Sequence, residues 1–333
     1  MTNKNILLNK PFFLKPAAKD YLWGGNRLND DFSKGIDMYP LAETWECSTH
    51  PDGPSIVASG EHIGKSLIEV LKDHPEYIGT HPKIKGELPI LIKLIDAKQD
   101  LSVQVHPSDE YAQKYEHGQL GKTEMWYILD ASKGTQFVYG FKMNQDKETI
   151  KKAIQNGTVE KYLQKVLVKK NDLFYIKAGT VHAIGAGALI AEIQESSNLT
   201  YRLYDYERTD KTGKKRELHI EKGLAVAELN GATEPRQPLR VLKYRRGCAS
   251  ELLCRCKYFE VYRMLLNTER CREMVSYQAD KTSFRVLLCT DGCGSLRTEE
   301  GIEEFFKGDC IFVPANSERL RLHGKAQFLD VKG

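Results

Sequence analysis

Short apolar runs broken by Gly, Pro, Asp and Asn occur along most of the chain, and several of them alternate with polar residues. Runs of this length and period predict β-strands. The run LPILIKLIDA at residues 88–97 is apolar except for Lys93 and Asp96. A lysine inside such a strand reaches the sheet edge or faces a polar cavity, and the polar strand that follows favours the cavity. The pattern predicts a mainly β fold.

Helical spacing is confined to a few segments. GKSLIEVLKD at residues 64–73 has the apolar spacing of a short amphipathic helix, which His74-Pro75 would end. The stretch PSDEYAQKYEHG predicts a helical turn that starts at Pro107. Residues 146–165 predict two short helices divided by Asn156-Gly157. We interpret this last segment as a small helical insert in a β-rich chain.

Four residues with metal-binding side chains lie in or beside strand-like runs: Gln104, His106, Glu124 and His182. Gln104 and His106 are two apart in an alternating run, so on a strand they point to the same face. A single histidine on an apolar face is usually a hydrogen-bonded core residue, but the whole set favours a metal site. Two imidazoles, a carboxylate and an amide oxygen suit Zn²⁺, and the lack of thiolate argues against a closed structural site.

With a divalent ion, one anionic and three neutral ligands leave the site with a net positive charge, which favours an anionic substrate. A weak internal repeat supports two barrels: residues 170–194 (KNDLFYIKAGTVHAIGAGALIAEIQ) resemble residues 307–332 (KGDCIFVPANSERLRLHGKAQFLDVK). The second copy has Arg319 where the first has His182. We therefore expect a metal-binding domain at residues 1–238, with its insert at about 146–165, and a β domain at residues 239–333 without metal ligands.

Composition and charge exclude several classes of protein. Forty-nine Lys and Arg against forty-five Asp and Glu give a net charge of +4 over 333 residues, with no arginine-rich stripe, so we expect no nucleic-acid partner. The N-terminal sequence MTNKNILLNKPFFLKP has no continuous signal-peptide core, and no later segment approaches a membrane span. We expect a cytoplasmic protein without a membrane partner.

Seven of the eight cysteines lie between Cys248 and Cys310. No CxxC pair occurs among them, which argues against a zinc ribbon, and the absence of an export signal argues against disulfides. We interpret these cysteines as small, mostly buried hydrophobic residues.

Several segments together resemble type I mannose-6-phosphate isomerases (phosphomannose isomerases) of the short, bacterial, zinc-dependent kind. The resemblance covers most of the chain and rests on these segments in the family's order: WGGNRL, ETWECSTHPDGPS, LPILIKLIDAKQDLSVQVHP, GKTEMWYIL, AGTVHAIGAGALIAEIQESSNLTYRLYDYERTD and RELHIEK. It implies a bicupin fold of two jelly-roll β-barrels, one zinc ion per chain, and interconversion of D-mannose 6-phosphate and D-fructose 6-phosphate through an enediol(ate).

The resemblance also implies roles residue by residue. The zinc ligands would be Gln104, His106, Glu124 and His182. Arg202 matches the family's active-site arginine and Lys122 a pocket lysine, which we take as the catalytic pair, while Lys93 and Ser102 match substrate-binding positions. Two departures occur: Lys177 stands where the cupin pattern usually has proline, and Asn198 where the family usually has aspartate.

Aldose–ketose isomerisation requires a base, and the residues leave its identity open among Lys122, Lys93, Glu192, His50 and a metal-held water. Arginine, lysine and serine side chains would hold the phosphate. Trp23, Trp45 and Trp126 fit core packing better than sugar stacking.

Tyr204 and Tyr206 are candidates for the pocket, and Asp205 for a bond to Arg202. The alternative functions are another metal cupin enzyme such as an iron oxygenase, a non-catalytic sugar-phosphate-binding cupin and a structural zinc protein. We expect a monomer, with a dimer as the alternative.

Overall fold

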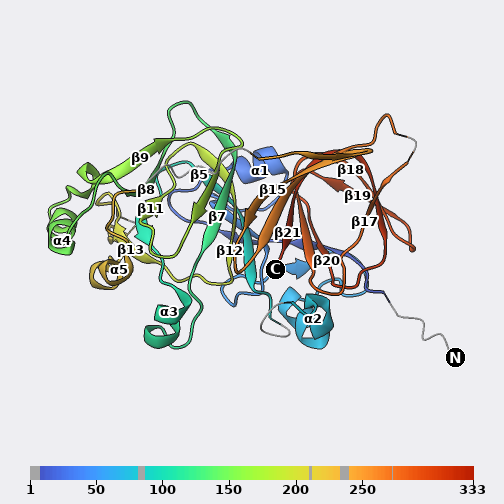
Figure 1. Ribbon diagram of the computed structural model, residues 1–333, viewed down its shortest axis with the longest axis horizontal. Helices are drawn as coiled ribbons and strands as arrows, with labels where there is room; N and C mark the ends of the chain where they lie inside the picture. The colour runs from blue at the N-terminus through green and yellow to red at the C-terminus, as the bar shows by residue number, and fades with distance from the viewer. Residues whose placement is uncertain (1–7, 82–86, 210–211, 233–239, 272) are drawn as a thin grey trace.

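The computed structural model describes residues 8–81, 87–209, 212–232, 240–271 and 273–333 (Figure 1). All the strand pairs between named strands in this part of the chain are antiparallel, and they form three sheets. The mainly β fold predicted from the hydrophobic pattern is confirmed. Among the described residues, no helix has the length and apolar character needed to cross a membrane.

Two of the sheets form the first half of the molecule, and we call them the paired sheets. The first has the order β10 (Leu173–Ile176), β7 (Glu124–Ala131), β12 (Ala188–Glu195), β5 (Ile90–Ala97), β3 (Glu43–Cys47) and β2 (Ala17–Lys19). The second has the order β13 (Tyr201–Tyr204), β6 (Val103–Val105), β11 (His182–Ala183), β8 (Gln136–Phe141) and β9 (Leu163–Leu167). Apolar side chains from both sheets share one core, in which Trp126 of β7 packs edge-on against Phe137 of β8.

The third sheet, which we call the C-terminal sheet, curls into the second half of the molecule (Figure 1). Its order is β14 (Lys243–Arg245), β15 (Cys248–Arg255), β16 (Glu260–Asn267), β21 (Leu320–Lys332), β18 (Arg285–Arg297), β20 (Cys310–Val313), β1 (Phe12–Lys15) and β4 (Ile56–Val57). Two further strands extend it, since β17 (Val275–Tyr277) pairs with β21 and β19 (Ile302–Phe306) pairs with β18. The chain therefore contributes strands to this sheet from near both of its ends.

The domain boundary expected between residues 238 and 239 lies outside the described residues, and the division there stays a prediction. The sheet assignments add that β1 and β4 are hydrogen-bonded into the C-terminal sheet, with Phe12 opposite Phe312. The largest apolar cluster also spans both halves, from Ile90 of β5 to Val286 of β18. The two halves thus share a core.

Five helices occur in the described residues: α1 (Arg27–Phe32), α2 (Leu67–Asp73), α3 (Asp109–Tyr115), α4 (Lys147–Gln155) and α5 (Ile220–Val226). The helix expected at residues 64–73 is α2, which begins with a capping box formed by Ser66 and Glu69. The helical turn expected at Pro107 begins two residues later, as α3, because the Ser108 side chain caps it. Single 3₁₀ turns occupy Pro75–Ile78 and Val159–Lys161.

The second helix predicted within residues 146–165 is wrong. After α4 only the 3₁₀ turn forms, and Leu163–Leu167 is β9, which pairs with β8. Leu163 and Val166 of this strand are buried, so pairing and burial in the sheet outweigh the local helical spacing.

Candidate functional site

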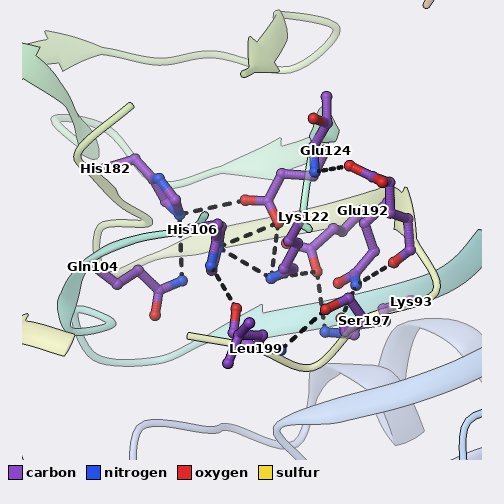
Figure 2. A network of polar contacts seen from close by, with 12 residues as sticks. Lys93, Gln104, His106, Lys122, Glu124, His182, Glu192, Ser197 and Leu199 are labelled. Carbon is purple, nitrogen blue, oxygen red and sulfur yellow. Dashed lines mark hydrogen bonds and ion pairs between the residues drawn. The ribbon is translucent and has the colours of Figure 1, made fainter. Parts of the chain in front are cut away.

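Three buried side chains that can bind metal converge between the paired sheets (Figure 2). Glu124 is the first residue of β7, His182 lies on β11, and His106 directly follows β6. One ligand atom from each lies within 4.8 Å of the others. The two oxygens of Glu124 lie 3.4 Å from His182 Nε2 and 3.6 Å from His106 Nε2. One sheet therefore supplies the carboxylate, while the other sheet and its flanking residue supply the imidazoles.

Backbone carbonyl groups orient both imidazole rings. His106 Nδ1 lies 2.9 Å from the Leu199 carbonyl oxygen, and His182 Nδ1 lies 2.8 Å from that of Thr180. A ring that donates its Nδ1 proton to a carbonyl leaves Nε2 with a lone pair, and Nε2 is the atom that faces Glu124 in both rings. Burial lowers the pKa of His106 well below its usual value and that of His182 to about 4, so both are neutral at pH 7, as metal binding requires.

The surroundings of Glu124 fit a bound cation. Neither of its buried oxygens has a hydrogen bond of normal geometry in the described structure. Burial and the nearby charge of Glu192 raise the pKa of Glu124, so a cation at this point would remove an energetic cost. Gln104 Nε2 lies 3.3 Å from His182 Nε2, and rotation of that amide would present its oxygen instead. His106, Glu124 and His182 could therefore hold a metal ion, and Gln104 lies close enough to add an oxygen ligand.

Two lysines and two further carboxylates lie beside the metal position (Figure 2 shows Lys93, Lys122 and Glu192). Lys122 Nζ lies 2.8 Å from Glu124, 3.2 Å from His106 Nε2 and 4.0 Å from Glu192. Lys93 Nζ of β5 lies 3.1 Å from Glu192 and 3.8 Å from Glu43. All of these side chains are buried, so their charges interact strongly.

Mutual attraction fixes the charge states of this group. Burial alone would lower the pKa of Lys93, but the carboxylates of Glu43 and Glu192 outweigh it and raise the pKa. Burial alone would raise the pKa of Glu192, but Lys93 and Lys122 outweigh it and lower the pKa. Indole groups hold the carboxylates in place, since Trp126 Nε1 donates to Glu192 at 3.0 Å and Trp45 Nε1 donates to Glu43 at 2.8 Å.

The two lysines, Glu43 and Glu192 line a cavity of about 260 Å³ whose wall also includes Ser102 and Arg202. Arg202 of β13 lies opposite Gln104 in the strand pairing and donates through Nη1 to the Glu217 carbonyl oxygen at 2.8 Å. Its Nε is buried and has no hydrogen-bond partner in the described structure. Burial and the charge of Arg216, a second arginine in the cavity wall, lower the pKa of Arg202. Two guanidinium groups at one cavity favour an anionic ligand.

The cavity gathers all of the residues assigned from the sequence to the catalytic and substrate roles: Lys93, Ser102, Lys122 and Arg202. The expected bond from Asp205 to Arg202 is wrong, because Asp205 binds Arg208 and Arg216 instead. The tyrosines expected there, Tyr204 and Tyr206, are absent from the described lining, and His50 lines a neighbouring cavity.

Sequence reasoning missed Glu43, Tyr21 and Arg216, which line the same cavity. A signal for Glu43 was present, because it lies two residues before Trp45 in the strand-like run ETWEC and so shares its face. Trp45 and Trp126 are fully buried, as core packing predicts, whereas Trp23 is buried and also lines the cavity.

The two departures from the family pattern lie outside the charged cluster. Lys177 is exposed and its Nζ lies 3.4 Å from Glu228, so it makes a surface ion pair. Asn198 Nδ2 donates to Asp52 Oδ2 at 2.9 Å. Asn198 borders both the 260 Å³ cavity and the neighbouring cavity lined by His50, so its amide joins two loops at the rim.

Comparisons with known proteins agree with this site. Residues 12–139 match the family model "Phosphomannose isomerase type I, catalytic domain", and residues 250–332 match "Mannose-6-phosphate isomerase, cupin domain". The chain is 38% identical over 325 residues to mannose-6-phosphate isomerase ManA of Bacillus subtilis, which covers 96% of this chain and 98% of that protein. It is 34% identical over 323 residues to the mannose-6-phosphate isomerase of Streptococcus mutans, covering 96% and 97%.

A solved structure extends the similarity to three dimensions. The crystal structure of the mannose 6-phosphate isomerase from Bacillus subtilis superposes with a TM-score of 0.88 at 34% identity, and the match covers 97% of this chain and 99% of that one. Similarity over nearly the full length of both chains, together with the buried His–Glu–His group, shows that this chain belongs to the type I mannose-6-phosphate isomerase family and is an isomerase enzyme.

Proposed function

We propose that the protein is a zinc-dependent isomerase that interconverts D-mannose 6-phosphate and D-fructose 6-phosphate. The observation that carries the proposal is one cavity that gathers buried lysines, carboxylates and two arginines directly beside the metal-ligand group. Lys122, which lines this cavity, lies 2.8 Å from Glu124. The relatives named for this activity resemble the chain over at least 96% of its length, which supports the same substrate pair.

A bound zinc ion would act as a Lewis acid that polarises the substrate carbonyl and stabilises negative charge on its oxygen. We infer zinc from the donor set, since two imidazoles, a carboxylate and an amide without thiolate are typical of zinc sites that keep an open position. His106, Glu124 and His182 would hold the ion, with Gln104 as the fourth ligand.

The residues of the cavity supply the acid–base chemistry. Isomerisation removes a proton from the carbon beside the carbonyl, passes through an enediol(ate) and returns a proton to the neighbouring carbon. Lys122, as a cation beside Glu124 and His106, would stabilise the negative oxygen that develops. We assign the proton transfer to Glu192, which lies within 4.0 Å of Lys122 and whose lowered pKa keeps it ionised at pH 7.

The remaining polar residues fit substrate binding. Arg202 and Arg216 carry positive charge in the cavity wall, and we propose that Arg202, with Ser102, binds the anionic groups of the sugar phosphate. Lys93 is held between Glu43 and Glu192 and would orient Glu192 while facing the sugar hydroxyl groups. We assign Asn198 a structural role at the rim of the cavity, because in the described structure its amide donates to Asp52 and makes no hydrogen bond to the charged residues within.

We further propose that the enzyme acts as a monomer in the cytoplasm. One chain supplies every group named above, which supports a complete site in each copy. All eight cysteines are free thiols, which is typical of a reducing compartment.

A coupled assay for both directions of the sugar-phosphate interconversion tests the proposal on protein that has been stripped with chelator and reloaded with zinc. We expect activity to disappear with the metal and to return with zinc. A reloaded protein that holds one zinc ion per chain but does not interconvert the two sugar phosphates would contradict the proposed function.

A further inference from the structure

The turn between β15 and β16 connects the C-terminal sheet to the segment that carries Lys122 and Glu124. Tyr258 Oη donates to Asp109 Oδ2 at 2.9 Å, and Lys257 Nζ lies 3.1 Å from the same oxygen. Asp109 is the first residue of α3, three residues after His106. The contact therefore joins the C-terminal sheet to the chain next to a metal-ligand residue.

The other oxygen of Asp109 binds the backbone that leads into Glu124. Gly121 N donates to Asp109 Oδ1 at 3.1 Å, and Lys122 N donates to the Pro107 carbonyl oxygen at 3.1 Å. A Cβ at Gly121 would lie 2.4 Å from Asp109 N, so the segment packs directly on the start of α3. Lys122 and Glu124 follow within three residues, and a shift of this segment would move both side chains.

A second carboxylate holds the next residue of the same segment. Glu195, at the end of β12, is buried and accepts a hydrogen bond from Thr123 N at 2.7 Å, while its own N–H donates to the Thr123 carbonyl oxygen at 3.0 Å. Its side chain also contacts that of Asp109. Two adjacent carboxyl groups thus bind the backbone at Gly121 and Thr123, on either side of Lys122.

On the side away from the start of α3, the neighbourhood of this segment includes open space. Asp109, Glu195, Tyr258 and Leu120 border a cavity of about 430 Å³ between the two halves of the molecule. The segment would have room to move toward this cavity if its hydrogen bonds were lost. The polar contacts are therefore what defines its position on this side.

We propose that Tyr258 and Lys257 of the C-terminal sheet are positioning residues for the active site, acting through Asp109 on the Gly121–Glu124 segment. The metal-free half of the molecule then contributes directly to turnover, by holding Lys122 and Glu124 at the geometry that the reaction requires. In its kinetic consequences this inference rests on the proposed function, whereas its structural consequence does not.

Substitutions at both ends of the contact test the inference. Asp109→Ala removes the acceptor for Gly121 N, while Asp109→Asn keeps an oxygen there. We expect Asp109→Ala to lower kcat about 30-fold with KM within about twofold of the wild type, and Asp109→Asn to restore most of the loss. Tyr258→Phe removes one of the two side chains that hold Asp109 and should lower kcat by only about fivefold, because Lys257 still contacts Asp109. Tyr262→Phe removes a hydroxyl group from the same sheet without touching Asp109 and should leave kcat unchanged.

Amide hydrogen exchange on the metal-free proteins supplies a readout that does not depend on activity. Exchange in residues 118–124 should rise about tenfold or more in Asp109→Ala, and less in Tyr258→Phe, at an unchanged thermal midpoint. Unchanged exchange and a kcat within about twofold of wild type in Asp109→Ala would overturn the inference. A wild-type enzyme without isomerase activity would contradict the proposed function instead, and the exchange data would still decide on the positioning role.

Discussion

Between the paired sheets a cluster of buried charged side chains lies beside an apolar core, whereas one apolar cluster fills the interior of the C-terminal sheet. Lys93, Lys122, Glu124 and Glu192 are each at most 4% exposed in the first region. Leu287, Phe305, Ile311 and Phe328 are fully buried in the second, where the tilted rings of Phe305 and Phe328 have centroids 5.0 Å apart. Buried charges reduce stability unless they are paired, and buried apolar groups increase it. The first region thus holds the candidate active site, whereas the apolar interior of the second contributes mainly to stability.

The same contrast appears at matching positions of the internal repeat. His182 follows the corner after β10 and is fully buried, whereas Arg319 follows the corner after β20 and is exposed. The repeat therefore preserves the turn and the strands while the functional side chain occurs in one copy only. Pairs of substitutions, one in each half, test whether catalysis depends on the first half and stability on the second.

The largest effect is expected at the metal position. His182→Ala removes one of the two imidazoles and should lower kcat about 1,000-fold or more, together with the loss of bound zinc. Arg319→Ala, at the matching position of the other half, should change neither. Metal content per chain and the coupled assay measure both outcomes, and a zinc-loaded, active His182→Ala protein would contradict the assignment of this ligand.

The next effect concerns stability. Phe328→Ala should lower the free energy of unfolding by about 3–5 kcal/mol, because a large cavity opens in the apolar interior of the C-terminal sheet. The folded fraction should keep a nearly normal kcat, since Phe328 belongs to the apolar cluster of the C-terminal sheet and does not line the cavity. Denaturant unfolding and kinetics at low temperature measure the two quantities. A large fall in kcat at full folding would show that the apolar interior also controls the active site.

A smaller effect on kcat is expected at one of two buried glutamates, Glu192 and Glu251. Glu192→Gln should lower kcat about 100-fold, because the neutral amide cannot accept the proton. Glu251→Gln removes a buried charge that lies 2.7 Å from Arg263 in the C-terminal sheet, and it should lower stability by about 1–3 kcal/mol with kcat unchanged. Equal losses of kcat in the two variants would mean that Glu192 acts through general stability, not through proton transfer.

The smallest effect is a pH dependence at the junction of the two halves. Burial and the neighbouring Asp109 raise the pKa of Glu195 to about 8 from a usual value of 4.5. Between about pH 4.5 and pH 8, the folded state therefore keeps a proton on Glu195 that the unfolded state has released. The stability contributed by this group falls as pH rises through that range. Gln does not titrate.

For this reason, Glu195→Gln should gain stability relative to wild type as pH rises, levelling above pH 8, by about 1–3 kcal/mol. Unfolding of the metal-free proteins between about pH 5 and pH 9 measures the difference, because Asp109, whose pKa is lowered, titrates below this range. A constant difference across the range would show that Glu195 is already ionised in the folded protein.

Local patterns in the sequence predicted the parts of the fold that depend on local structure. The period-two run that carries Gln104 and His106 predicted a shared face, and the two Asp-led turns of the repeat correspond to the starts of β10 and β20. The buried, mostly apolar role of the cysteines holds for Cys248, Cys254, Cys289 and Cys310, whereas Cys293 is exposed.

Contacts between distant segments were beyond such reasoning. Arg216 reaches the cavity from a loop, where it binds Asp205. The spacing of residues along the chain favoured Arg202 as the partner of Asp205, because the two are only three residues apart. Leu163–Leu167 has polar and charged neighbours that fit a helix locally, yet its pairing with β8 makes it a strand. The pairing of β1 with β20 depends on residues from near the two ends of the chain, and no periodic pattern reports such a pairing.

That pairing has a consequence for the order in which the protein is made. During synthesis β1 (Phe12–Lys15) emerges long before β20 (Cys310–Val313), with which it pairs. Until β20 emerges, the apolar residues Phe12 and Leu14 have no sheet to join, and a separately produced fragment of residues 240–333 would expose the edge of β20. We expect that fragment to aggregate, and a peptide containing residues 8–16 to reduce the aggregation by pairing with β20.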